Sequence, residues 1–163
     1  LRGVIRRRRP GIGILWGGVM WPWQAKRYDE GARKITATYI SERFGIPREN
    51  APEWQQYLAL QEDRLFALFR SAHRPIPRSQ LKSGGPNCIY ASRLCLADIE
   101  RAAFESGLNF CPAAGKVSFW RPGAKVPHQD IVAIPERGNE WYYDPITCIW
   151  RREIGGSQAR YQF

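Results

Sequence analysis

Three residues in the second half of the chain have the types and the order that a cysteine-nucleophile reaction requires. Cys88 follows a Gly-Gly-Pro-Asn run and precedes an apolar helical pattern, His128 begins a β-rich run, and Asp144 ends an aromatic one. A thiolate nucleophile needs a base that forms it and a carboxylate that holds this base in one tautomer. The order and contexts of these residues therefore predict a Cys-His-Asp site for acyl transfer.

The predicted position of Cys88 favours the thiolate form. A thiol at a helix N-terminus feels the positive end of the helix dipole. The preceding glycines let a substrate chain approach the backbone, and free N–H groups of the first turn can receive an oxyanion. The alternative is a buried structural cysteine, which is the usual role of a free thiol.

The histidine and the carboxylate also have alternatives. His128 is predicted to be held by a strand, the alternative being a surface strand residue, whereas His73 ends a helical pattern and is predicted to be a C-cap. We expect Asp144, rather than Asp130, to hold the His128 ring across a hairpin. Asp130 is the rival because it lies two residues from His128 on the same strand face. The alternative for Asp144 is a turn opener before Pro145.

Composition narrows the class of protein. The chain has 163 residues, 44% of them hydrophobic, which suits one compact domain. Its net charge of +10 fits a polyanionic partner such as nucleic acid, an anionic membrane surface or an acidic protein, although basic chains also gain solubility this way. Four cysteines without a CxxC motif and only two histidines argue against a structural zinc site or a disulfide scaffold. We expect mostly free thiols and no cofactor.

The first 27 residues are basic and rich in Trp and Gly. We expect the run Arg6, Arg7, Arg8 and Arg9 to be a solvated arm that could contact a polyanion. The apolar stretch 11–23 is shorter than the about 20 residues that span a bilayer, and no small-residue cleavage site follows it. We expect it to pack on the domain or on a partner. Because the chain begins with Leu1, we expect a fragment, a processed product or an incomplete chain.

Periodicity predicts an α+β fold for a single domain over residues 28–163, with a helical part at 28–78 and a catalytic core at 80–163. Apolar residues recur with helical spacing at 29–44, 52–72 and 88–106, with Asp29 and Asn87 as expected N-caps. The period then changes to two at 116–120, 129–134, 140–143 and 148–152. We therefore expect N-terminal helices, a central helix opened by Cys88, and a C-terminal antiparallel sheet packed on that helix.

Residues of about 84–148 resemble the papain-like superfamily of the transglutaminase-like, bacterial protein-glutaminase and papain-fold toxin type. The shared pattern is Asn-Cys opening a helix, a His at a strand start, and an aromatic strand ending in Asp-Pro. Here it reads Asn87-Cys88, His128 and Tyr142-Tyr143-Asp144-Pro145.

The chain departs from this pattern in two places. Gln129 and Asp130 follow the histidine, where members often have a small residue. No glutamine lies at the short upstream spacing that papain uses for its oxyanion hole, and Gln80 is the nearest one before Cys88.

The resemblance implies thiolate attack on a peptide or carboxamide carbonyl, giving an acyl-enzyme. Water would complete proteolysis or glutamine deamidation, and an amine would complete transglutamination. Asn87 and Gln80 are the candidate oxyanion or substrate-binding residues, and Trp141 is expected to line the site. The resemblance also suggests a toxin or effector domain of a larger secreted bacterial protein, secreted or delivered into a target-cell cytoplasm. Its partners would be a protein or peptide substrate and a cognate inhibitor or carrier.

Two other classes of function stay open from the sequence. One is a non-enzymatic, ribonucleoprotein-type protein that binds nucleic acid through its arginines and stacks bases on its aromatic side chains. The other is a nuclease toxin that uses His128 with Lys or Arg groups. The acyl-transfer hypothesis predicts that Cys88 and His128 are adjacent, whereas the binding protein predicts no such pair.

Overall fold

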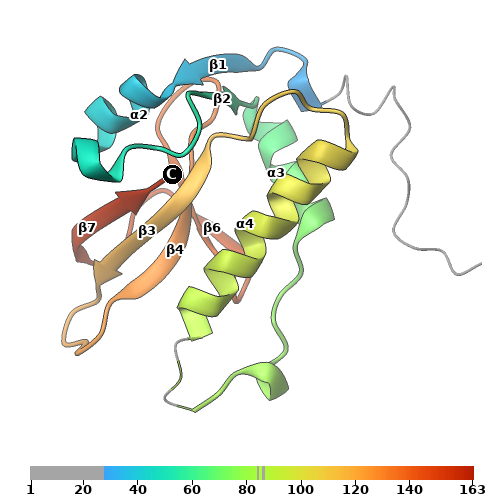
Figure 1. The fold of residues 1–163 in the computed structure, drawn as a ribbon. Coiled ribbons are helices and arrows are strands. Elements are labelled where there is room, and N and C mark those ends of the chain that lie inside the picture. The colour runs from blue at the N-terminus through green and yellow to red at the C-terminus, as the bar shows by residue number, and fades with distance from the viewer. Residues whose placement is uncertain (1–27, 84, 86) are drawn as a thin grey trace, which may run out of the picture.

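The computed structural model describes residues 28–83, 85 and 87–163, and it has the mixed α+β architecture that the sequence predicts (Figure 1). The predicted segment 1–27, with its arginine run, lies outside the described residues, as do Gly84 and Pro86. No helix in the described ranges is both long enough and apolar enough to cross a membrane. The helices and strands, in chain order, are β1 Arg33–Thr36, α2 Ala37–Phe44, β2 Gln56–Ala59, α3 Glu62–Ala72, α4 Asn87–Glu105, β3 Ala114–Trp120, β4 His128–Ala133, β5 Trp141–Asp144, β6 Ile149–Arg151 and β7 Ser157–Gln162.

A five-stranded antiparallel sheet forms the C-terminal half, in the order β6-β5-β4-β3-β7. The long helix α4 lies across this sheet (Figure 1), and its buried residues Cys95, Ile99 and Ala103 share one core cluster with Ile131 and Ala133 of β4. The expected central helix and four of the five strands therefore occur close to their predicted positions. Strand β7 is not predicted from the sequence, because this edge strand consists mostly of exposed polar residues, with two partly buried ones.

The N-terminal half differs from the prediction. The first halves of the predicted helices 29–44 and 52–72 contain β1 and β2, which form a separate antiparallel pair. Ile35 and Tyr57 face each other in that pair, and both are buried. Burial of this pair outweighs the helical spacing of the apolar residues. Helix α2 is capped by Thr36, whose Oγ1 accepts a hydrogen bond from Tyr39 N at 3.1 Å, and not by Asp29.

Aromatic packing fixes α3 to the same side of the sheet as α4. The ring of Phe69, which is fully buried, lies 5.1 Å from that of Tyr143 and 4.8 Å from that of Trp150. Leu65 and Leu68 of α3 join the cluster that also contains the buried face of α4. Helices α3 and α4 therefore hold strands β4 and β5 from one side.

We predict that Phe69→Ala lowers the free energy of unfolding by about 3–5 kcal/mol, because it leaves a cavity beside the rings of Tyr143 and Trp150. Phe104→Ala is the matched control. Phe104 is 82% exposed on α4, so its loss should change stability by no more than about 0.5 kcal/mol. Urea unfolding followed by tryptophan fluorescence measures both, and equal effects would contradict this description of the core.

Candidate active site

Cys88 is the second residue of α4, and its half-buried thiol forms a hydrogen bond with the ring of His128. This hydrogen bond lowers the pKa of Cys88. Burial opposes the shift, and hydrogen bonds from the backbone N–H groups of Gln129 and Ile89 add to it. The sulfur therefore lies in an environment that stabilises negative charge.

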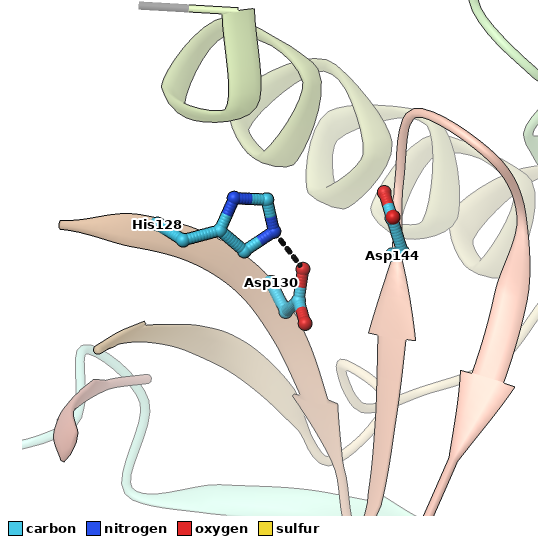
Figure 2. Close-up of side chains that lie close together, drawn as sticks. All are labelled: His128, Asp130 and Asp144. Atoms are coloured by element: carbon cyan, nitrogen blue, oxygen red, sulfur yellow. Dashed lines mark hydrogen bonds and ion pairs between the residues drawn. The ribbon is translucent and has the colours of Figure 1, made fainter. Parts of the chain in front are cut away.

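His128 is the first residue of β4 and lies opposite Phe119 of β3. Its Nε2 is 2.8 Å from Oδ1 of Asp130, and Figure 2 shows its other nitrogen on the side of the ring that faces the helix. Nδ1 is therefore the atom left for the thiol. Burial of the ring works against protonation, but the hydrogen bonds with Asp130 and Cys88 outweigh it and raise the pKa of His128 to about 9.

The two shifts have opposite signs and favour the same charge state, a thiolate beside an imidazolium. The pKa values of the other three cysteines shift in the opposite direction from that of Cys88. Burial raises the pKa of Cys95, Cys111 and Cys148. Among the four thiols, only that of Cys88 is shifted towards the nucleophilic form.

The predicted role of Asp144 is wrong in its geometry, because Asp130 holds the ring instead. Residues two apart on a strand point to the same face, so the Asp130 side chain reaches Nε2 directly. Asp144 lies to the side of Asp130, at the end of the neighbouring strand β5 (Figure 2). Its Oδ1 accepts hydrogen bonds from Ile146 N at 2.9 Å and Thr147 N at 3.4 Å. Asp144 is thus the turn opener that the sequence left as the alternative.

Asp144 still contributes to the site through Arg151 of β6. The Arg151 guanidinium donates to Asp144 Oδ2 at 3.0 Å, and its Nη1 lies 3.8 Å from Asp130 Oδ2. Asp130 is 1% exposed, and its Oδ2 has no hydrogen-bond partner within the described part of the chain. Arg151 therefore supplies the positive charge that a buried carboxylate requires. Nothing in the sequence distinguished Arg151 from the other arginines of the strands.

The two carboxylates and the histidine lie close enough together to suggest a metal site. One ligand atom from each of His128, Asp130 and Asp144 lies within 4.8 Å of the others. However, the guanidinium of Arg151 already lies beside both carboxylates. In addition, Oδ1 of Asp130 is hydrogen-bonded to the His128 ring. A metal ion would compete with that guanidinium for the carboxylates, so the cluster fits a network of ion pairs better than a metal centre.

No hydrogen bond joins the side chain of Asn87 or Gln80 to Cys88 or His128 within the described part of the chain. Asn87 is the first residue of α4, and its side chain binds the backbone of Lys82 through hydrogen bonds of 3.0 and 2.8 Å. It fastens the preceding loop to the start of the helix. Gln80 is exposed on a 3-10 turn, and no described contact joins it to Cys88 or His128.

Trp141 does not line the site either. It pairs with Ala133, five residues along β4 from His128, which corresponds to about 16 Å at the usual rise per residue. Its indole N–H donates to Glu62 of α3 at 2.8 Å, and the Arg152 guanidinium lies 3.4 Å from its ring centroid. Trp141 therefore stabilises the far end of the sheet.

Gln129 is a site residue whose only signal in the sequence was its departure from the family pattern. Its Nε2 donates to Ser118 Oγ of β3 at 3.0 Å, and its Oε1 accepts from Ser92 Oγ of α4. Its backbone N–H also bonds the sulfur of Cys88. Gln129 thus fastens the helix to the sheet at the point where the thiol meets the ring.

His73 is the C-cap of α3, as predicted, and it supports the site from behind. Its ring is buried, with Nδ1 3.0 Å from Asp98 Oδ2 and Nε2 2.8 Å from the carbonyl oxygen of Pro145. It thereby ties α3 and α4 to the turn that Asp144 opens.

Compared with known proteins, the chain matches no protein-family model and no curated protein sequence. The residues and their geometry are therefore the basis for assigning a function.

We predict that Asp130→Asn lowers the pKa of His128 by about 1 to 3 units, because the substitution removes the carboxylate that holds the protonated ring. Asp144→Asn should have a smaller effect, since Asp144 acts through Arg151. An NMR titration of the histidine ring signals measures both, with His128→Ala to assign them. A larger shift in Asp144→Asn would restore the sequence-based assignment.

We also predict that brief treatment with iodoacetamide near neutral pH labels Cys88 before the other three cysteines. The label can be located by mass spectrometry of peptides. His128→Ala should slow the labelling of Cys88, because the largest cause of its lowered pKa is lost. Faster labelling of Cys95, Cys111 or Cys148 would contradict the assignment of the nucleophile.

Proposed function

We propose that this protein is a cysteine-dependent acyl-transfer enzyme, either a protease or a protein glutamine amidase. Cys88 is the nucleophile, His128 the general base and acid, and Asp130 the residue that orients the ring. The observation that carries the proposal is the hydrogen-bonded chain from thiol to imidazole to buried carboxylate, with the pKa values of Cys88 and His128 shifted in opposite directions.

In the proposed mechanism, the Cys88 thiolate attacks the carbonyl carbon, forming a carbon–sulfur bond while the electron pair of the carbonyl moves to oxygen. Backbone N–H groups at the start of α4 are the nearest candidates for stabilising that oxyanion. The His128 imidazolium then gives its Nδ1 proton to the departing amine or ammonia, which leaves a thioester. Neutral His128 next takes a proton from water, the water attacks the thioester, and the carboxylic acid product departs as the ion pair re-forms.

The arrangement also supports the proposed relationship to the papain-like superfamily. A helix opened by the nucleophile packs on an antiparallel sheet whose strand begins with the base. The role as a toxin or effector domain rests on the sequence resemblance alone, and it stays part of the proposal. The binding-protein alternative expected no contact between Cys88 and His128, so that contact favours the enzyme.

We predict that the protein modifies one or more members of a panel of unfolded proteins, and that one of three readouts identifies the reaction. New N-termini indicate proteolysis, release of ammonia without cleavage indicates deamidation, and incorporation of a labelled amine indicates transglutamination. Cys88→Ala should abolish the reaction, and His128→Ala should slow it by about 10²–10⁴-fold.

Cys111→Ala is the matched control, because Cys111 is also a half-buried free thiol but its pKa is raised. It should retain activity. Conversion that survives in Cys88→Ala would refute the mechanism, and so would a wild-type protein that converts none of the panel yet binds nucleic acid.

A further inference from the structure

Arg121 makes a contact at the candidate site that the proposed mechanism does not use. It follows the last residue of β3, and its Nη2 lies 2.8 Å from Nε2 of His128. The same Nε2 is 2.8 Å from Asp130 Oδ1. An imidazole nitrogen carries either a hydrogen or a lone pair, so it cannot serve a donor and an acceptor together. Since Nε2 donates its hydrogen to Asp130, it cannot accept a hydrogen bond from the Arg121 guanidinium.

Arg121 also has no carboxylate partner within the described part of the chain. Other arginines do, including Arg43, Arg64 and Arg101, each of which forms an ion pair with an acidic side chain. Arg121 is exposed, and the hairpin residues 121–127 include Lys125 but no acidic residue. The guanidinium therefore lies at an open, cationic edge of the site, beside a ring that is itself positively charged when protonated. Its charge opposes the raised pKa of His128.

We propose that Arg121 binds a carboxylate of the substrate, so that the protein acts on acidic segments of a polypeptide chain. This inference rests on the proposed function. The planar guanidinium can bind both carboxylate oxygens at once, which makes it the cation of choice for this recognition. Arg121 and Cys88 contact the same imidazole ring. A carboxylate on Arg121 would hence lie within a side chain's length of the attacked carbonyl, and it would neutralise the cation next to the imidazolium.

Two alkylating agents that differ in charge test this inference without knowledge of the substrate. Iodoacetamide is neutral and reports the reactivity of the Cys88 thiolate, whereas iodoacetate brings a carboxylate to the same sulfur. We expect Arg121→Gln to lower the ratio of iodoacetate to iodoacetamide rates at Cys88 by about fivefold, which is the effect of one unit-charge contact at 4 Å in water-like surroundings. The iodoacetamide rate serves as the internal standard in each variant.

Lys125→Gln is the matched control, because it removes one positive charge from the same exposed hairpin. Its ratio should stay near that of the wild type. An unchanged ratio in Arg121→Gln, or an equal fall in Lys125→Gln, would overturn the inference. Failure of iodoacetamide to select Cys88 in the wild-type protein would instead count against the proposed function.

A second measurement does not depend on thiol reactivity. Titration with N-acetylglutamate should shift the NMR signals of the His128 ring in the wild-type protein and in Lys125→Gln. The shift should be lost in Arg121→Gln. A shift that persists in Arg121→Gln would place the anion elsewhere and overturn the inference.

Discussion

The hydrogen bond between the Cys88 thiol and the His128 ring is the interaction on which the proposed chemistry depends. It joins the first turn of α4 to the first residue of β4, two elements that are far apart in sequence. Apolar packing of α4 on β4 brings them together, and Gln129 then fixes their relative position through Ser92 and Ser118. The site is thus built on a packed helix and strand, whose positions are better defined than those of loops.

A second constraint is the free-energy cost of burying the charged carboxylate of Asp130 next to the His128 ring. Asp130 is almost fully buried, and an isolated charge there would be strongly unfavourable. The structure compensates on both sides, with His128 at one oxygen and Arg151 near the other. Asp144 holds Arg151, and His73 ties the turn after Asp144 to α4 through Asp98. Groups from α3, α4, β5 and β6 therefore all help to hold the His128 ring in one orientation.

Local signals in the sequence predicted the parts of the site that depend on local structure. The glycine-rich run before Cys88 and the change of period before His128 located the helix start and the strand start. The choice between Asp130 and Asp144 could not be made in the same way. It depends on where β5 ends along β4, which is short of His128, and on where Arg151 lies, and both follow from strand pairing. Trp141 was misplaced for the same reason, since its strand is correct but its register puts it at the far end.

In the N-terminal half, too, local sequence patterns did not predict features that depend on strand pairing. Residues 33–36 and 56–59 lie inside the longer segments 29–44 and 52–72, whose apolar spacing suits a helix. They nevertheless pair as strands, with Ile35 and Tyr57 opposite each other and both buried. The coarse α+β class followed from the C-terminal half, where a long amphipathic helix precedes several alternating strands.

The most direct test of the central claim is a pH titration of the Cys88 thiolate, followed by its ultraviolet absorbance as the difference between the wild-type protein and Cys88→Ser. We predict that the thiolate forms well below the pKa of about 8.5 of a free thiol. In the His128→Ala background, the same difference should titrate at a higher pH, because burial remains and the hydrogen bond is gone. A Cys88 thiol that titrates like a free thiol, with or without His128, would contradict the ion pair and the mechanism built on it.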